Sequence, residues 1–462
     1  MNQSKSLLKN TFIYTIGNLG SKLLTFSLLP ILSFYLSKKE LGEYDVVLTT
    51  ISMFVPFVSL QISDAAYKWL LNREAEDYDA LRSKIITNGL LIIIVTSVIF
   101  LAAYFTVGAF VPLNYKYHFA AILLSSIFLP YFQQVTRGLQ KNKLYAIAGL
   151  SNAVFVLGFN ILFLIGLKMK LEALFLALII ANFATCIILV QFSGVYKFIN
   201  FKLYSTALQK QMLTYCLPLI PNSISWWLVN AADKFLILYY LGVNSNGIYA
   251  ISSRLPSIIT ILNTIFILAW QDHSMTSKDS SIDSKTFDRF YTFELSFVLV
   301  LISASKIIVE GIVSSSFIDA YKYMPMLFIG AAYSAFSAYF GAYYLKSGNT
   351  KGIFVTSIAG GVTNIVVVLL LIKHIGLYSS ALGTFLSFMV MFVYRYIDLK
   401  KEINLKVNML KLISLTVLCV VFSLALLIHF RYINYILLVL AIGIFLFLNS
   451  EVIVKLKKMV FK

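Results

Sequence analysis

Apolar runs of about 20 residues follow one another along the chain, and short polar segments separate them. A helix of about 20 residues rises roughly 30 Å, which matches the hydrocarbon core of a bilayer. The pattern therefore predicts an all-α integral membrane protein with about fourteen transmembrane helices. We place the spans at 11–36, 46–67, 85–110, 117–136, 144–167, 171–192, 212–241, 247–270, 290–312, 323–345, 352–372, 376–396, 410–430 and 432–454.

Composition and charge support this class. Hydrophobic residues make up 59% of the chain and charged residues only 13%, whereas soluble domains carry about 25% charged residues. The net charge of +18 would suggest nucleic acid as a partner of a soluble protein. Here one side of the membrane, with Arg395 at the end of the span 376–396 included, receives about three times as many Lys and Arg as the other side, as the positive-inside rule requires. We therefore predict no nucleic acid partner and cytoplasmic N- and C-termini.

A short motif recurs after two of the predicted spans. Tyr-Leu followed by Gly-x-Tyr occurs at residues 35–44 and again, with the same internal spacing, at residues 240–249. Six spans separate the copies, so both copies have the same orientation in the membrane, as in parallel repeats related by an axis along the membrane normal. The predicted domains are an N-terminal six-helix lobe (1–195), a cytoplasmic interlobe linker (196–211), a C-terminal six-helix lobe (212–400), and two extra helices with a cytoplasmic tail (401–462).

The segment between the lobes is basic and aromatic. Residues 193–211 read SGVYKFINFKLYSTALQKQ. Two interpretations remain open: a solvated linker along the inner surface, or a contact for anionic lipid headgroups.

The seventh span is the most polar. Its polar side chains fall close to one side in helical steps: Asn222, Ser225, Asn230 and Asp233. A helix with this pattern has one face for lipid and one for a polar cavity or a partner. Lys234 points about 100° away from Asp233 and either faces the cavity or reaches outward.

Other charges inside the spans are candidates for cargo or ion binding. Lys22 lies near the middle of the first span, with Asn18 and Thr25 at helical spacing and nothing acidic close in sequence. A cation at that depth requires a buried acid or an anionic cargo. We predict that these three residues line a central cavity.

The remaining intramembrane charges have structural explanations as well. Asp233 and Arg254 lie at matching depths in consecutive spans and either pair with each other or contact cargo. Asp64, near the inner end of the second span, is either a proton or cation site or an ordinary acid at a helix end. Lys306 and Glu310 are spaced i, i+4 and are expected to pair with each other.

Little in the sequence points to an enzyme. The chain lacks a G-x-x-x-x-G-K-[ST] phosphate loop, and its four histidines lie far apart without metal-ligand spacing. Its short loops leave no room for a soluble catalytic domain. We therefore expect no cofactor, no metal site and no enzymatic activity.

Two stretches resemble a known family. Residues 217–249 contain Leu-Pro-Leu-Ile-Pro-Asn, then Asp-Lys, Leu-Gly and Gly-Ile-Tyr, and this run resembles the seventh-span motif of bacterial polysaccharide exporters. The opening, with Asn10, Pro30 and Gly42-x-Tyr44, is similar to the start of the same family. These are the Wzx-type oligosaccharide flippases of the multidrug/oligosaccharidyl-lipid/polysaccharide superfamily.

The resemblance implies two six-helix lobes around a central cavity. It also implies translocation of undecaprenyl-pyrophosphate-linked oligosaccharide repeat units from the inner to the outer leaflet of the bacterial cytoplasmic membrane, for O-antigen or capsule assembly. Membrane lipids, and polymerase and chain-length proteins of the same pathway, are the expected partners. The candidate cargo-binding residues are Lys22, Asn18, Thr25, Asn222, Asn230, Lys234 and Arg254, and the candidates for ion coupling or structural pairing are Asp64 and Asp233.

Three other functions remain open at this point. A lipid II flippase has the same span count. A multidrug exporter of the same superfamily would need deep acidic residues for organic cations, whereas the deepest lone charge here is positive. A membrane subunit of envelope assembly without transport activity is the alternative from another class.

Overall fold

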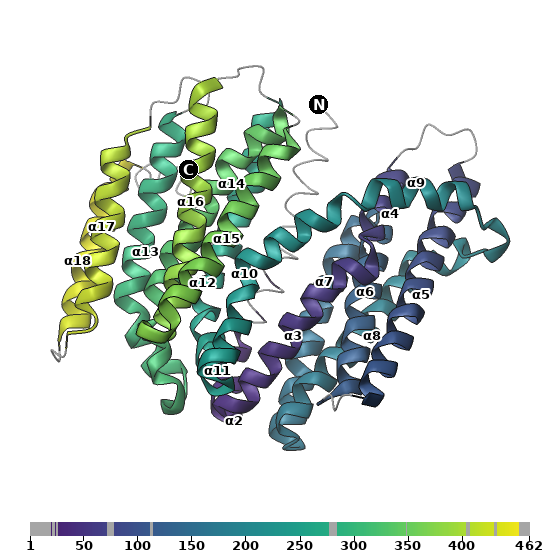
Figure 1. Cartoon of the computed structure of the whole chain (residues 1–462), viewed down its shortest axis with the longest axis horizontal. Coiled ribbons are helices and arrows are strands. Elements are labelled where there is room, and N and C mark those ends of the chain that lie inside the picture. The colour runs from purple at the N-terminus through teal and green to yellow at the C-terminus, as the bar shows by residue number, and fades with distance from the viewer. Residues whose placement is uncertain are drawn as a thin grey trace, which may run out of the picture. The chain divides into compact units, whose positions relative to one another are not determined.

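Helices make up the regular structure of the described part of the chain. The computed structural model describes residues 20, 24, 26–71, 78–110, 114–276, 284–347, 349–402, 407–428 and 432–451. They form two compact units (Figure 1). The first unit contains residues up to Leu36 together with Glu43–Trp227, and the second contains Ser37–Gly42 together with Leu228–Lys462.

The first unit contains most of the N-terminal helices. They are α2 Leu28–Tyr35, α3 Lys38–Ser59, α4 Ile62–Leu70, α5 Tyr78–Phe110, α6 Lys116–Gly138, α7 Asn142–Asn160 with the π-helical turn η1 Ile161–Gly166, α8 Lys170–Ser193, the 3₁₀ turns η2 Val195–Phe198 and η3 Phe201–Leu203, and α9 Thr206–Cys216. The first turn of α3 belongs to the second unit. Helix α10, Leu219–Leu241, begins in the first unit and ends in the second.

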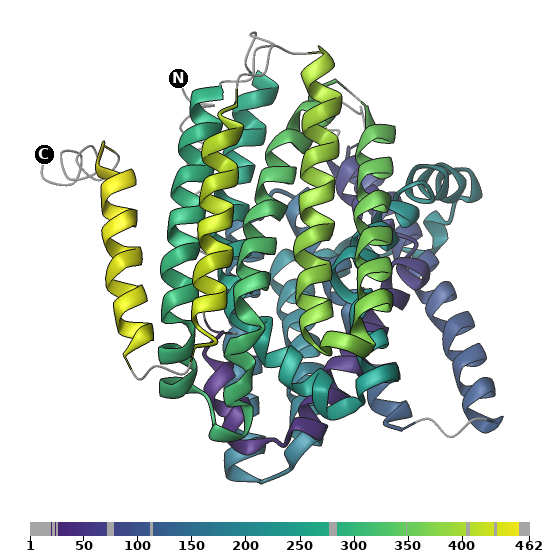
Figure 2. The ribbon, with the colours of Figure 1, turned by 60° about the vertical axis from the view of Figure 1, so that its left-hand side comes forward.

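The second unit contains the remaining helices. They are α11 Val243–Ser252, α12 Arg254–Thr276, α13 Ser284–Ile312, the 3₁₀ segment η4 Ser315–Lys322, α14 Met324–Lys346, α15 Thr350–Ile375, α16 Tyr378–Glu402, α17 Met409–Ala425 and α18 Ile433–Leu448. Helices α17 and α18 pack beside α13 at one edge of this unit (Figure 2).

The membrane class is confirmed. Eight of the described helices are long and apolar enough to cross a membrane, and α17 and α18 are shorter apolar helices. Within the described residues, every predicted span from 46–67 onward is mostly helix, with short breaks in the second, seventh and eighth spans. The first span, 11–36, is described mainly through α2, and the rest of it lies outside the described residues. The chain is a multi-pass, all-α integral membrane protein.

Polar side chains cap the N-termini of helices α9 and α15 by accepting hydrogen bonds from backbone amides of the first turn. Ser205 accepts a hydrogen bond from the Leu208 amide at 3.4 Å at the start of α9. Asn349 accepts one from the Gly352 amide at 2.8 Å at the start of α15. Such caps satisfy amides that have no partner inside the helix, and replacing one by alanine typically costs about 1 kcal/mol.

The start of the seventh span differs from the prediction. The expected helix 212–241 is broken at Leu217–Pro218, so Met212–Cys216 belong to α9 and only α10 forms the span. Pro218 has no amide proton to donate and its ring crowds the preceding turn, which ends α9. The second span is interrupted as well, because Leu60 and Gln61 have left-handed backbone angles, φ 48° and 55°, between α3 and α4.

The two copies of the repeated motif meet in the second unit. A methyl group added at Gly42 would overlap the carbonyl oxygen of Val243, and one added at Gly247 would overlap the carbonyl oxygen of Lys38. Asn246 strengthens the contact by donating to the Gly42 carbonyl at 3.3 Å. In the repeat, Gly42 corresponds to Gly247 and Lys38 to Val243. The contact is therefore reciprocal, as a two-fold relation between repeats requires.

A buried arginine ties three helices of the second unit together. Arg395 on α16 is only 2% exposed. It donates to the Ser337 carbonyl on α14 at 2.8 Å and to the Thr356 hydroxyl on α15 at 3.0 Å. Gly341 leaves the space that the guanidinium occupies. Helix α16 continues to Glu402, beyond the predicted span end at 396, and keeps this side chain inside the helix bundle.

Candidate functional site

A polar pocket lies inside the second unit. Its volume is about 280 Å³, and residues of α10, α11, α12, α14 and α16 line it. The lining combines one ammonium group and one amide with several hydroxyls and a few apolar groups: Lys234, Asn230, Tyr249, Ser253, Ser257, Thr260, Ser334, Thr384, Pro256, Leu327, Ala331 and Phe388. In the described part of the chain this is the pocket in which predicted cargo-binding residues meet.

Three hydroxyls of the pocket lie along one face of α12 and the residue before it. Ser253, Ser257 and Thr260 follow each other at helical spacing. Ser253 donates to the Ala250 carbonyl at 3.0 Å and Ser257 to the Arg254 carbonyl at 2.6 Å. A hydroxyl whose proton is bound to its own helix keeps its lone pairs as acceptors. This face of the pocket is therefore built to accept hydrogen bonds.

Helix α10 supplies the donors. Asn230 and Lys234 are spaced i, i+4, so both reach the pocket from one face of the helix. An ammonium group has three donors and no acceptor, and an amide has both. Lys234 lies among the residues that line this pocket, and its role toward cargo stays a prediction.

Behind the lining, a buried acid holds the tyrosine of the repeated motif. Asp233 is 2% exposed and accepts a hydrogen bond from the Tyr249 hydroxyl at 2.8 Å. The same hydroxyl lies 3.5 Å from the Thr384 hydroxyl. Through Tyr249, α10, α11 and α16 are held in fixed positions around the pocket.

The ion pair expected between Asp233 and Arg254 is not among the ion pairs of the described residues. Arg254 is the first residue of α12, beside the lining residue Ser253, and does not itself line the pocket. The Asp233 carboxylate instead accepts a hydrogen bond from the Tyr249 hydroxyl. Tyr249 was noticed in the sequence only as part of the repeat, because a tyrosine pattern alone does not indicate which acid it will meet.

Other predicted residues lie elsewhere. Asn222 is in the first unit and does not line this pocket. Asp64 is also in the first unit, on α4, where the guanidinium of Arg137 is its electrostatic neighbour. Arg137 in turn lies 4.4 Å from the Tyr67 ring centre. An ion-coupling role for Asp64 stays a prediction. Lys22, Asn18 and Thr25 lie outside the described residues.

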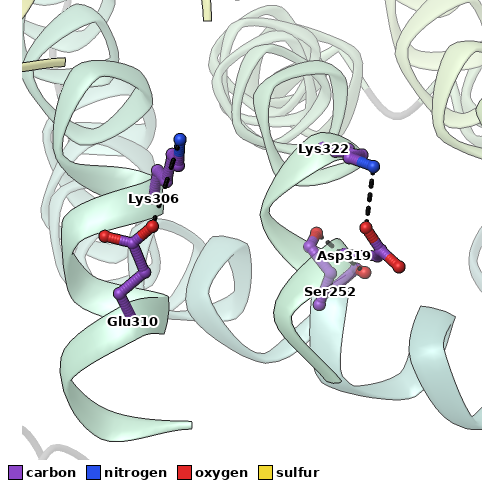
Figure 3. A network of polar contacts seen from close by, with 6 residues as sticks. Ser252, Lys306, Glu310, Asp319 and Lys322 are labelled. Atoms are coloured by element: carbon purple, nitrogen blue, oxygen red, sulfur yellow. Dashed lines mark hydrogen bonds and ion pairs between the residues drawn. The ribbon is translucent and has the colours of Figure 1, made fainter. Parts of the chain in front are cut away.

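Two ion pairs lie near η4 (Figure 3). Lys306 and Glu310 approach to 4.0 Å on α13, which confirms the expected i, i+4 pair. Lys322 contacts Asp319 at 2.7 Å, and this hydrogen bond raises the pKa of Lys322. Ser252 donates to the Ala320 carbonyl at 3.0 Å and so attaches α11 to η4. The Lys306–Glu310 pair is partly exposed and contributes only a few tenths of a kcal/mol.

One buried acid was not identified in the sequence. Glu294 on α13 is 4% exposed and accepts a hydrogen bond of 2.7 Å from the Asn263 amide on α12. The two groups lie in a niche of about 130 Å³ whose other walls are aliphatic and phenylalanine side chains. Glu294 gives little signal in the sequence, because it follows the polar run of residues 271–289 by only a few positions. Within the described ranges, no three His, Cys, Asp or Glu side chains are grouped to hold a metal ion.

Comparison with known proteins identifies the family. A family model described as "Polysaccharide biosynthesis protein" matches residues 7–270, which is more than half of the chain. The chain belongs to this family. A curated relative, "Lsg locus putative protein 1" of Haemophilus influenzae, is 28% identical over 261 residues. The match covers 55% of the chain and 62% of the length of that relative.

Solved transporters share the fold of this polysaccharide biosynthesis family member. The lipid II flippase MurJ in an inward closed conformation aligns with TM-score 0.70 at 14% identity, covering 96% of the chain and 99% of MurJ. A MATE transporter in complex with MaL6 aligns with TM-score 0.60 at 12% identity, covering 85% and 96% of the two chains. A MOP superfamily transporter from Pyrococcus furiosus aligns with TM-score 0.54 at 10% identity, covering 85% and 96%. The chain therefore has the fold of these solved transporters.

Proposed function

We propose that this protein is a flippase for undecaprenyl-pyrophosphate-linked oligosaccharide repeat units. In this proposal it moves them from the inner to the outer leaflet of the bacterial cytoplasmic membrane by alternating access, and the product is assembled into O-antigen or capsule. The observation that carries the proposal is membership of a polysaccharide biosynthesis family in a chain that has the fold of these solved transporters. Polymerase and chain-length proteins would act on the delivered units.

The chemistry of the pocket in the second unit supports such a cargo. Sugars present hydroxyls that both donate and accept, and the face formed by Ser253, Ser257 and Thr260 offers acceptors. Lys234 offers charge-assisted hydrogen bonds to an anionic group such as a pyrophosphate or an acidic sugar. The apolar side of the pocket, including Phe388, can pack against a sugar ring.

The lysine of the first span belongs to the same proposal. Lys22, with Asn18 and Thr25, would contact the pyrophosphate from the N-terminal span. Lys22→Ala is expected to reduce transport strongly at normal membrane expression, and Lys22→Arg to keep part of the activity because the charge is kept. Full complementation by Lys22→Ala at native expression would remove Lys22 from the cargo path.

The test is transport by the purified full-length protein in liposomes. A lipid-linked oligosaccharide is placed in the vesicles, and the fraction reached by a membrane-impermeant glycosidase is followed with time. Wild-type protein is expected to make the inner-leaflet pool accessible. Lys234→Ala should slow this at least about tenfold, because losing a charge-assisted contact costs roughly 1.5 kcal/mol or more. Lys373→Ala, an exposed lysine beside Tyr240 at the end of α15, is the matched control and should be normal.

The same vesicles separate the rival functions. Movement of an organic cation without movement of the lipid-linked sugar would identify a multidrug exporter. Movement of lipid II alone would identify a lipid II flippase. If the folded protein moves none of the three compounds, the remaining interpretation is a non-transporting subunit of envelope assembly.

A further inference from the structure

The segment that follows α8 is bound tightly to the first unit. We call residues 194–217 the basic strap. Buried Thr87 and Asn88 on α5 hold its backbone: the Thr87 hydroxyl accepts from the Asn200 amide at 2.9 Å, and Asn88 donates to the Leu203 carbonyl at 2.9 Å. Asn88 also accepts from the Ser205 amide at 2.9 Å. These hydrogen bonds attach the backbone of the basic strap to α5.

The inner side of the basic strap is part of the core of the first unit. Val195, Met212 and Cys216 are fully buried, and the Cys216 thiol donates to the Gln61 carbonyl at 3.1 Å. Helix α9 packs on α4 and α5 and lies across one end of the unit (Figure 1). The buried face fixes which residues of the strap point outward.

The outer side combines exposed aromatic rings with lysines. Tyr196, Phe201 and Tyr204 are 49%, 58% and 56% exposed. Lys197, Lys202 and Lys210 are exposed too, and none of them forms an ion pair with a carboxylate in the described part of the chain. The sequence contains no Asp or Glu between Glu172 and Asp233.

Several other cations at this end of the unit have partners within the protein. Lys68 lies 3.8 Å from the centre of the Tyr215 ring. Arg82 contacts Asp79, and Lys141 donates to the Ser193 carbonyl at 2.7 Å. These side chains stabilise the strap and its supports. Lys197, Lys202 and Lys210 lie on the exposed side of the strap without a carboxylate partner in the described part of the chain, so they are available to a partner outside the protein.

We propose that the basic strap is a binding site for anionic phospholipid headgroups of the bilayer leaflet at this end of the protein. Lys197, Lys202 and Lys210 contact the lipid phosphates. The exposed rings of Tyr196, Phe201 and Tyr204 lie among the headgroups, where amphipathic aromatic side chains are favoured. Basic residues beside a membrane span are attracted to anionic lipids by roughly fivefold in affinity each.

The combination of groups favours a membrane over a soluble partner. A soluble acidic protein needs the lysines but gains nothing from three half-exposed rings placed next to membrane-spanning helices. A lipid surface interacts with both sets of groups. The aromatic rings pack between the lipid headgroups, and the ammonium groups contact the lipid phosphates. The rigid attachment to Thr87 and Asn88 holds both sets in place without a folding step on binding.

The test compares lipid retention by two variants of equal charge. Full-length protein is purified in a neutral detergent, incubated with equal amounts of phosphatidylglycerol and phosphatidylcholine, and the bound lipids are counted by native mass spectrometry. Wild-type protein is expected to prefer phosphatidylglycerol. Changing Lys197, Lys202 and Lys210 together to Gln should lower this preference at least about tenfold, given roughly fivefold for each lysine. The control changes Lys116, Lys168 and Lys170, at the opposite end of the unit, to Gln.

Each outcome decides the proposal. The control variant should keep the wild-type preference, and Phe201→Ser with Tyr204→Ser should reduce it while all lysines remain. Equal losses in the two lysine variants would show that net charge alone determines lipid binding, and would overturn the site.

A second set of outcomes concerns the kind of partner. If the strap variant keeps its lipid but no longer binds a polyglutamate peptide, the surface binds an acidic protein instead. Inorganic phosphate at matched anion concentration should not displace the lipid. The thermal unfolding midpoints of all variants should match that of wild type, since the changed side chains lie mainly at the surface.

Discussion

The hydroxyl of Tyr249 and the carboxylate of Asp233 lie 2.8 Å apart in the interior of the second unit, with both side chains almost fully buried. Tyr249 lines the polar pocket and Asp233 does not. The tyrosine therefore separates a buried charge from the space in which cargo is expected to bind. Its position is set by an acid on α10, although the residue itself belongs to α11.

Tyr249→Phe is expected to destabilise the protein by about 1.5 to 3 kcal/mol, because it removes a hydrogen bond to a buried carboxylate. The thermal unfolding midpoint in detergent measures this. Tyr239→Phe, where the ring is 81% exposed, is the control and should be neutral. Equal midpoints for the two variants would mean that the Tyr249 hydroxyl contributes nothing to stability.

Glu294 is expected to act through its hydrogen bond to Asn263. Glu294→Gln retains an acceptor for the Asn263 amide and should be tolerated. Glu294→Ala leaves that amide buried without its partner and opens a cavity, at a cost of about 2 to 4 kcal/mol. Unfolding midpoints distinguish the variants, with Glu310→Ala as a half-exposed control. If Glu294→Gln unfolds as early as Glu294→Ala, the negative charge itself is required.

Arg395→Ala should be among the most destabilising single changes in the second unit. It removes hydrogen bonds to two helices and empties a space lined by Gly341. We expect a loss of about 3 kcal/mol or more and a lower yield of folded protein. Lys400→Ala, at the exposed end of the same helix, should give wild-type yield. Size-exclusion chromatography of the solubilised protein provides the measurement, and a normal Arg395→Ala profile would contradict the structural role.

Gly247→Ala should disturb the reciprocal contact between α3 and α11. The added methyl group meets the Lys38 carbonyl, and the backbone has to move apart. Overpacking of this kind costs about 1 to 3 kcal/mol. Gly443→Ala on α18, where the space beside the glycine is open, is the control and should be neutral or slightly stabilising. The idea fails if both alanine variants unfold at the same temperature as wild type.

The sequence predicts the helices well because lipid imposes a simple rule. A spanning segment needs about 20 apolar residues, and the chain provides such runs from end to end. Breaks within runs are harder to predict. Pro218 divides the expected seventh span, and the left-handed turn at Leu60 and Gln61 divides the second without a glycine or proline at those positions.

The site was only partly predictable. Asn230 and Lys234 were identified because they interrupt an apolar span, and they do line one pocket. Hydroxyls such as Thr384 give no such signal, since serine and threonine are common in membrane helices and bind their own backbone. The hydrogen bonds of the buried Arg395 could not be predicted either. Its acceptors lie on α14 and α15, and periodicity within α16 does not reveal them.

The basic strap also has a consequence for the order in which the protein is made. Its polar partners Gln61, Thr87 and Asn88 all precede it in the chain. When Pro218 leaves the ribosome, every group that fixes the strap has already been synthesised. The strap can therefore close the first unit before the greater part of the second exists, so that the lipid-facing lysines are in place while the later helices are still being inserted.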